Sequence, residues 1–292
     1  MAAPLRLAAA PISWGVCEVP GWGYQLPPER VLGDMARLGL RDIEAGPPGF
    51  LPDDLAAARA LLTGRGLRVI ASFATAVLHR PDRLDSELLF VERRARRIAS
   101  LGGTILVLAA ATGQDGYDAP YTLREAEWRA LLAALPRVVD VAASCGLTVA
   151  LHPHVGTAIE SAFAIDRVLR ESDVALCLDT GHVFVGGGDA VRIAREHRGR
   201  VAHVHLKDAD ASLAAAARER RVPYARAVAQ GLFRPLGDGD ARIADVLAAL
   251  RAGGYAGWAV LEQDIALAQA PAAEKDPARD VERSRDFVRM RG

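Results

Sequence analysis

The sequence has no excess of charge of either sign and no long apolar run. Its 36 basic residues balance 36 acidic residues, so the formal net charge of the 292-residue chain is zero. A neutral protein offers no general electrostatic attraction to nucleic acid or to an anionic membrane, so we expect neither as a partner. No apolar run reaches the roughly 18 residues that a membrane-spanning helix needs. Small molecules are therefore the expected partners.

Cysteine is also scarce. The three cysteines are widely spaced and form no CxxC pair, which excludes a disulfide framework and a thiolate zinc site. The first 13 residues are apolar, but two prolines and an arginine interrupt them, which is not typical of a signal peptide. A reducing compartment fits this pattern, and we expect a cytoplasmic protein.

Short apolar runs alternate with longer stretches of helical periodicity along the whole chain. The expected strands cover residues 7–13, 41–45, 67–73, 104–109, 147–152, 174–179, 200–207 and 257–262. The expected helices cover residues 28–38, 52–65, 82–101, 122–145, 160–170, 187–197, 240–252 and 277–290. Eight strand–helix units in this order predict a single-domain (β/α)8 TIM barrel spanning residues 1–292, a fold that typically needs about 250 residues. The rival, an open doubly wound sheet, is disfavoured because no GxGxxG motif opens the first helix.

One connection is longer than a normal loop between a strand and a helix. Residues 208–236 separate the seventh strand from the next predicted helix, and Ser212–Arg221 within them has helical character. We expect this insertion to form an active-site lid or a contact between subunits.

Ionisable residues stand at the carboxyl ends of five predicted strands, on the parity that faces the barrel interior. They are Glu44, His152, His154, Asp179, His203, His205, Lys207, Glu262 and Asp264. Successive side chains of a strand alternate between the two faces, so these groups should converge at one mouth of the barrel. Burying them unpaired would cost several kcal/mol each, and barrel active sites lie at this end. The pattern therefore predicts an active site.

Four of these residues form a candidate metal site. His152, Asp179, His205 and Glu262 offer two imidazoles and two carboxylates, a set that suits Mn²⁺, Co²⁺, Mg²⁺ or Zn²⁺. The alternative is a hydrogen-bonded ion network without a metal. His182 is a further candidate, as a ligand, as a donor to substrate or as a helix cap.

Three further positions have structural interpretations. Trp14, just past the first strand, can stack on a sugar face or simply pack in the core. His203 lies deeper than His205 and should orient it rather than bind metal. Asp42 lies deeper than Glu44 and is read as a buried structural carboxylate.

Several segments resemble the xylose-isomerase-like sugar phosphate isomerase/epimerase superfamily, almost from end to end. The sequence is most similar to the branch of inosose (2-keto-myo-inositol) dehydratases. The segments that carry the resemblance are APISWG (10–15), IEAGPPG (43–49), LHPHVGT (151–157), CLDTGH (177–182), HVHLKD (203–208), PLGDG (235–239) and GWAVLEQD (257–264). The resemblance implies that Asp179, His205 and Glu262 bind one divalent metal, most often Mn²⁺ or Co²⁺.

The resemblance also implies a reaction. The expected enzyme is a metal-dependent lyase that dehydrates a cyclic keto-polyol, such as 2-keto-myo-inositol, through an enolate. Lys207, His154 and Glu262 are the candidates for acid and base, and the sequence does not divide these roles between them. Glu44, Trp14 and His182 would hold the substrate.

Two alternatives remain open from the sequence. One is a sugar isomerase or epimerase with the same metal site. Ketose 3-epimerases, which are similar in outline, carry a glutamate where His152 stands, and they differ at Ala158 and Ala211 as well. The other is an accessory subunit of a hetero-oligomeric lyase. A homo-oligomer is compatible with either reading.

Overall fold

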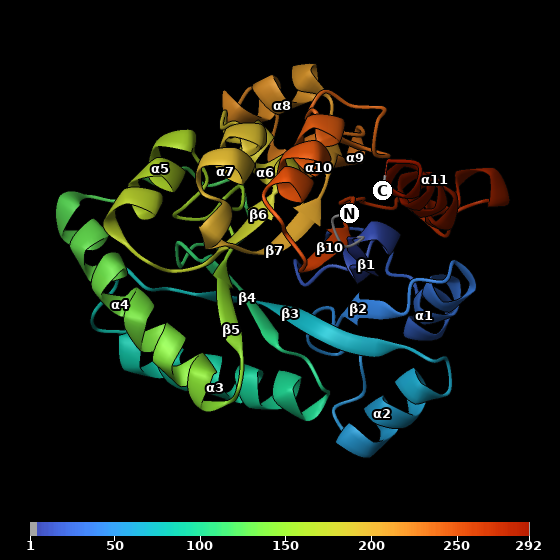
Figure 1. The fold of residues 1–292 in the computed structure, drawn as a ribbon, viewed down its shortest axis with the longest axis horizontal. Helices are drawn as coiled ribbons and strands as arrows, with labels where there is room; N and C mark the ends of the chain where they lie inside the picture. The colour runs from blue at the N-terminus through green and yellow to red at the C-terminus, as the bar shows by residue number, and fades with distance from the viewer. Residues whose placement is uncertain (1–4, 292) are drawn as a thin grey trace.

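The computed structural model describes residues 5–291, and its strands form a closed parallel barrel (Figure 1). The barrel strands are β1 (Arg6–Ala9), β2 (Asp42–Glu44), β3 (Arg68–Ala76), β4 (Ile105–Ala110), β5 (Thr148–Leu151), β6 (Leu176–Asp179), β7 (Val201–Leu206) and β10 (Trp258–Leu261). Each pairs with its neighbour in chain order, and β1 closes the barrel against β10, with Arg6 opposite Trp258. The predicted TIM barrel is confirmed.

The eight predicted helices are all present on the outside of the barrel (Figure 1). They are α1 (Pro28–Arg37), α2 (Leu55–Thr63), α3 (Leu84–Ser100), α4 (Glu125–Ser144), α5 (Ala162–Glu171), α7 (Ala190–Glu196), α10 (Ile243–Ala252) and α11 (Pro277–Arg289). Several begin at residues that cap the free N–H groups of the first turn. Ser161 accepts from the backbone N–H of Ala164, and Asp276 accepts from that of Ala278 at the start of α11. Among the described residues, no helix combines the length and apolar character needed to cross a membrane.

The first strand is shorter than predicted. The sequence predicts a strand over residues 7–13, but β1 ends at Ala9 and a 3₁₀ helix, η1 (Pro11–Trp14), follows. Proline has no N–H to give to a neighbouring strand, and it is well suited to the first position of a helical turn. This turn decides where Trp14 points.

Side-chain parity along the strands agrees with the expectation. Ala150, Cys177 and Val260 pack together inside the barrel, in a small interior core. Leu151 and Leu178, their neighbours of opposite parity, belong to the larger core between strands and helices. Because the parity holds, inward-facing residues just past the carboxyl end of each strand lie at the barrel mouth.

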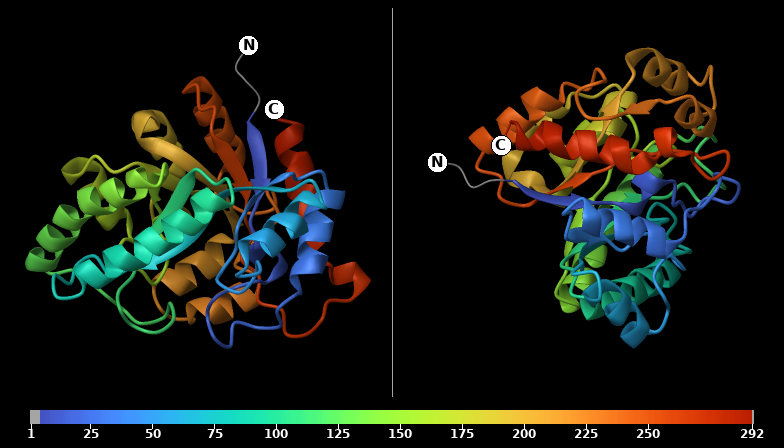
Figure 2. Two further views of the ribbon diagram at one scale, coloured as in Figure 1. Left: turned by 90° about the horizontal axis from the view of Figure 1, so that it is seen from below. Right: turned by 90° about the vertical axis from the view of Figure 1, so that its right-hand side faces the viewer.

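The insertion has more structure than the sequence predicts. It contains β8 (Asp208–Ala209), α8 (Ala211–Arg218), α9 (Tyr224–Ala229) and β9 (Phe233–Arg234), and β8 pairs antiparallel with β9. The helix expected over Ser212–Arg221 is found but ends three residues earlier, and α9 was not predicted. In Figure 2 the insertion lies at the end of the barrel toward which the strands point.

Asp208 joins the two ends of the insertion. Its carboxylate is 1% exposed and accepts hydrogen bonds from the backbone N–H groups of Ala209, Gly237, Gly239 and Ala241, at 2.8–3.2 Å. A Cβ at position 239 would lie 2.5 Å from Oδ1 of Asp208, so only glycine allows this approach. The segment after the insertion is therefore fastened to the end of β7.

Candidate active site

Four side chains from four strands converge at the barrel mouth. The ligand atoms of His152, Asp179, His205 and Glu262 all lie within 4.8 Å of one another. Oδ2 of Asp179 is 3.3 Å from Nε2 of His152 and 3.4 Å from Nδ1 of His205, and Nδ1 of His205 also contacts Oε2 of Glu262. The inward parity of β6 and β7, continued past β5 and β10, brings the four together as expected.

A buried carboxylate fixes the orientation of the His205 ring. Nε2 of His205 and Nε2 of His203 each lie close to Oε1 of Glu44, at 2.9 and 2.8 Å. Burial opposes ionisation, but the contacts with His205 and His203 lower the pKa of Glu44 overall. An ionised carboxylate only accepts hydrogen bonds, so both Nε2 atoms carry hydrogen and Nδ1 of His205 is free to face Asp179 and Glu262.

His203 contacts Glu44, which in turn contacts the ring of His205, and its orienting role stays a prediction. Glu44 itself was expected to hold substrate, and it does line the cavity described below. The structure adds a second contact for it, with the two imidazoles beneath. Asp42 lies two residues before Glu44 on β2. It pairs with Arg68 through both carboxylate oxygens, at 2.9 and 3.0 Å. Its structural interpretation is confirmed.

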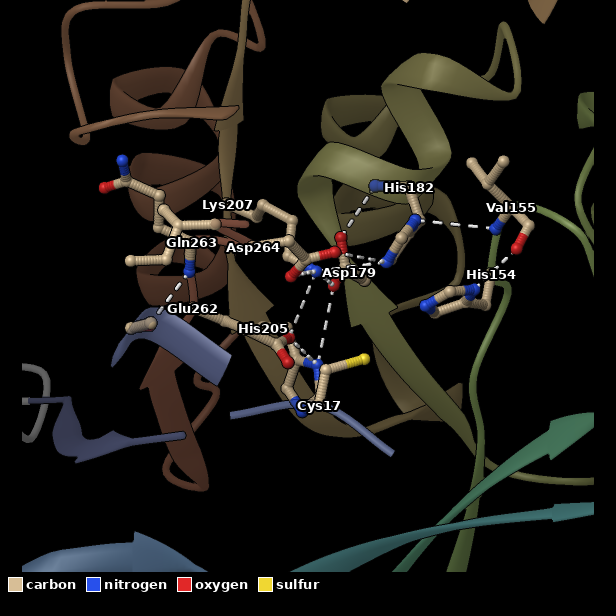
Figure 3. Close-up of polar contacts among 12 residues, drawn as sticks. Cys17, His154, Val155, Asp179, His182, His205, Lys207, Glu262, Gln263 and Asp264 are labelled. Atoms are coloured by element: carbon tan, nitrogen blue, oxygen red, sulfur yellow. Dashed lines mark hydrogen bonds and ion pairs between the residues drawn. The ribbon is translucent and has the colours of Figure 1, made fainter. Parts of the chain in front are cut away.

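The ammonium group of Lys207 lies among carboxylates rather than on the cavity wall (Figure 3). Nζ is 2.7 Å from Oδ1 of Asp264, 3.3 Å from Oδ2 of Asp179 and 3.4 Å from Oε2 of Glu262. Burial alone would lower the pKa of Lys207, but Asp179, Asp264 and Glu262 together raise it above its usual range. Lys207 was predicted as a candidate acid or base at the barrel mouth, but its side chain is 1% exposed and turns back toward the cluster.

A glycine gives Lys207 this position. A Cβ at residue 181 would lie 2.6 Å from Cγ of Lys207, so any other side chain there would displace the lysine. Thr180 holds the lysine backbone, since its hydroxyl accepts from the N–H of Lys207 and donates to its carbonyl, both at 2.8 Å. These contacts explain the residues between Asp179 and His182 in the sequence.

His154 and His182 stack beside the cluster, with ring centroids 3.8 Å apart. Nδ1 of His154 is 2.6 Å from the carbonyl oxygen of Val155. A carbonyl only accepts, so Nδ1 carries the hydrogen and Nε2 keeps its lone pair. Burial, with the nearby His152 and Lys207, keeps the pKa of His154 well below its usual value.

His182 was expected to contact substrate, but its side chain lies behind the residues that line the cavity. Its Nε2 is 3.0 Å from Nζ of Lys207, and it does not line the cavity. The backbone N–H of His182 donates to Oδ1 of Asp179, which caps the short helix α6 (Thr180–Val185). Contact between the His182 side chain and substrate therefore stays a prediction that the geometry does not support.

A cavity opens above the cluster. Side chains of the cluster line its floor together with His154 and Asp264, and its walls carry residues that the sequence did not single out. These wall residues are Ile12, Cys17, Glu18, Trp22, Phe73, Phe90, Arg94 and Tyr117. Phe73 lies against the rings of His152 and His154, with centroid distances of 5.8 and 6.0 Å. Half of these residues, Cys17, Glu18, Trp22 and Tyr117, lie on loops, where no periodicity marks a direction.

Trp14 is not one of the wall residues, which corrects the expectation that it stacks on substrate. Because η1 turns the chain at Pro11, Trp14 points into the core between strands and helices and is fully buried. Its Nε1–H donates to Oδ2 of Asp34 on α1, at 3.3 Å. The tryptophan at the cavity is Trp22, whose Nε1–H donates to the carbonyl of Ile265, at 2.8 Å.

The residues of the cluster fit a divalent metal ion. Nδ1 of His205 and Oε2 of Glu262 are buried without any hydrogen-bond partner among the described residues, although they point at each other and at Asp179. Unpaired buried polar atoms are costly unless something satisfies them. Two imidazole nitrogens and two carboxylate oxygens are a donor set for Mn²⁺, Co²⁺, Zn²⁺ or Mg²⁺.

The closed parallel barrel, with polar residues gathered at the carboxyl ends of its strands, defines the chain as a (β/α)8-barrel enzyme. A family model described as xylose isomerase-like TIM barrel matches residues 32–289, and the chain belongs to this family.

Relatives in the family include dehydratases. The chain is 32% identical over 285 residues to a protein named inosose dehydratase from Geobacillus thermodenitrificans (strain NG80-2), covering 94% of this chain and 91% of the relative. It is therefore an enzyme similar to the inosose dehydratases, which are hydro-lyases.

Solved structures share the fold at lower identity. D-psicose 3-epimerase from Clostridium cellulolyticum H10, solved with D-tagatose, has a TM-score of 0.72 and 17% identity, over 98% of this chain and 99% of that chain. The IOLI protein with a bound zinc atom has a TM-score of 0.70 and 14% identity, over 98% of both chains.

Proposed function

We propose that the protein is a metal-dependent lyase that removes water from a cyclic keto-polyol such as 2-keto-myo-inositol. The observation that carries the proposal is the position of His154. Its imidazole lines the same cavity as His152 and Glu262. Because Nδ1 is hydrogen-bonded to the carbonyl of Val155, Nε2 keeps a lone pair and can act as a base. The similarity to inosose dehydratases over 94% of the chain supports this reaction and this substrate class.

The proposed metal ligands are His152, Asp179, His205 and Glu262. A divalent ion there would act as a Lewis acid for oxygen atoms of the substrate and would favour loss of the proton next to the ketone. Mn²⁺ or Co²⁺ is our first choice, and the donor set also accepts Mg²⁺ or Zn²⁺. Glu44 holds the ring of His205 in the orientation that such binding needs.

Three side chains of this protein move the protons. His154 accepts the proton from the carbon beside the ketone, because the lone pair of its Nε2 is available at the cavity. The departing hydroxyl needs a proton in return. Glu262 lines the cavity and Lys207 stands behind it, with Nζ 3.4 Å from Oε2, so this pair delivers a proton from the interior of the barrel.

The cavity walls hold the polyol. Aromatic faces of Trp22, Phe73 and Tyr117 cover apolar faces of the ring, and Glu18 and Arg94 offer an acceptor and donors to hydroxyl groups. Glu44, which also lines the cavity, is placed to contact a hydroxyl from below. The free cysteines fit a reducing compartment, and we propose a cytoplasmic location.

A ketose epimerase is the second candidate, because solved epimerases share the fold. Epimerisation would need a second group to return the proton from the opposite face, and position 152 holds a histidine in the metal cluster instead of a glutamate. The dehydratase therefore remains the better proposal.

Assays of purified enzyme with 2-keto-myo-inositol and with free ketoses distinguish the two. We expect Mn²⁺-dependent formation of a cyclic dione from the ketoinositol, followed by its absorbance and by mass spectrometry. A chelator should abolish turnover, and Mn²⁺ or Co²⁺ should restore it. Epimerisation of ketoses at carbon 3, without reaction of the ketoinositol, would overturn the proposal in favour of the epimerase.

A further inference from the structure

A tyrosine of the insertion reaches into the site from above. Tyr224 is the first residue of α9 and is only 3% exposed. Its ring lies among aromatic groups from four other segments, with centroid distances of 6.2 Å to Trp22, 5.9 Å to Tyr117, 6.1 Å to His182 and 6.3 Å to Phe233. This packing leaves the ring one direction in which its hydroxyl can point.

The hydroxyl points at Asp264. It donates to Oδ2 of Asp264 at 2.8 Å, and the other oxygen, Oδ1, lies 2.7 Å from Nζ of Lys207. A chain of two short contacts therefore joins the insertion to the ammonium group. Hydrogen bonds to an ionised group are stronger than those between neutral groups, so this chain constrains both side chains.

The position of Asp264 decides where the ammonium group lies. Asp264 is the nearest of the three carboxylates around Nζ, since Asp179 and Glu262 are 3.3 and 3.4 Å away. Asp264 thus holds the ammonium closer to its own oxygen than to the other two carboxylates, which the ammonium also contacts. Without a fixed Asp264, the ammonium would settle between Asp179 and Glu262 and neutralise the two carboxylates of the metal cluster.

We propose that Tyr224 is a positioning residue for catalysis: through Asp264 it holds the Lys207 ammonium within reach of Glu262 and keeps it from moving closer to the two carboxylates of the metal cluster. This inference rests on the proposed function, in which Lys207 and Glu262 deliver a proton. It also assigns the insertion a place in the active site. The insertion then acts on the site through Asp264, which lines the cavity, and is not only a cover or a subunit contact.

The first test compares Tyr224→Phe and a control variant with wild type. Tyr224→Phe removes one oxygen atom and keeps the ring, so the aromatic packing stays. We expect kcat to fall about tenfold or more, the change that loss of one hydrogen bond to a charged group produces, with KM nearly unchanged. Tyr255→Phe is the matched control, because its buried hydroxyl donates only to the carbonyl of Trp258, outside the cavity, at 2.7 Å. It should lower the melting temperature without changing kcat.

A double-mutant cycle shows whether Tyr224 acts through Asp264. In the Asp264→Asn background, Tyr224→Phe should lower kcat by less than twofold, because the group it positions is already altered. The inference would be overturned if the losses of kcat in Tyr224→Phe and Asp264→Asn multiplied in the double variant. It would also be overturned if Tyr224→Phe lost thermal stability while its kcat stayed unchanged.

Crystal structures separate this inference from the proposed function. In metal-loaded Tyr224→Phe, Nζ of Lys207 should leave its contact with Asp264 and move toward Asp179 and Glu262. If wild-type enzyme does not dehydrate 2-keto-myo-inositol, the proposed function fails, and the position of Nζ in the two structures still decides the inference. An ammonium group that stays in the same position in Tyr224→Phe would contradict the inference about Tyr224.

Discussion

Nε2 of His205 lies 2.9 Å from Oε1 of Glu44, on the side of the ring away from the metal cluster. This contact assigns the hydrogen to Nε2 and turns Nδ1 toward Asp179 and Glu262. A carboxylate behind a histidine in this way raises the basicity of the ring and fixes its orientation. Glu44, on a different strand, therefore supports the proposed metal site from beneath.

Replacing Glu44 should weaken metal binding without destroying the fold. We expect Glu44→Gln to lower the affinity for Mn²⁺ about 10- to 100-fold, the usual effect of removing such a carboxylate. Isothermal titration with Mn²⁺ measures it. Asp42→Asn, two residues earlier on β2, is the control, because Asp42 pairs with Arg68 and not with a ligand. An unchanged affinity in Glu44→Gln would show that His205 does not depend on Glu44 for its orientation.

Replacing Lys207 should separate metal binding from catalysis. Lys207→Met removes a positive charge 3.3 Å from Asp179 and 3.4 Å from Glu262. Affinity for Mn²⁺ should rise by about tenfold, because a cation no longer competes for these carboxylates. At the same time kcat should fall by about 10²–10⁴-fold, if the ammonium supplies a proton. Weaker metal binding, measured by titration, would contradict the charge argument.

Trp22 should contribute to substrate binding, and Trp14 should not. Trp22→Ala removes an aromatic wall of the cavity, so KM should rise about tenfold, which corresponds to roughly 1.4 kcal/mol of binding free energy. Trp14→Phe is the matched control, since Trp14 is fully buried and bonded to Asp34. It should lower the melting temperature with KM unchanged. Steady-state kinetics distinguish the two, and equal KM values for Trp22→Ala and wild type would remove Trp22 from the site.

Asp208 should be important for stability. Asp208→Asn places an amide N–H₂ group against backbone N–H donors, so the free energy of unfolding should fall by about 3 kcal/mol. Denaturant titration measures the change. Asp238→Asn, at the position between Gly237 and Gly239, removes only an exposed ion pair with Arg283 and should cost less than about 1 kcal/mol. Similar losses in the two variants would mean that the contacts of Asp208 add little.

Strand periodicity was enough to predict the barrel and the convergence of the metal cluster. Alternation fixes which face of a strand a residue occupies, so residues such as Asp179 and His205 could be placed from their parity alone. Their adjacent register, Asp179 opposite His205, follows from neighbouring strands that end at the same level.

The remaining site residues depend on contacts that no local pattern encodes. Trp14 was misplaced because a proline ended the strand early and a 3₁₀ turn redirected the side chain. Trp22 and Tyr224 lie on segments whose path depends on tertiary packing. The turn of Lys207 toward the interior depends on carboxylates from two other strands and on the missing side chain at Gly181.

The hydrogen bonds of Asp208 make the insertion a separable module. Because its carboxylate fastens Gly237, Gly239 and Ala241 to the end of β7, the points where residues 210–236 leave and rejoin the barrel stay fixed. Segments of other lengths and sequences could be exchanged between these points while the eight strands and the metal cluster keep their geometry. A change of substrate in this scaffold could then be made, by evolution or by design, through replacement of one contiguous stretch of chain.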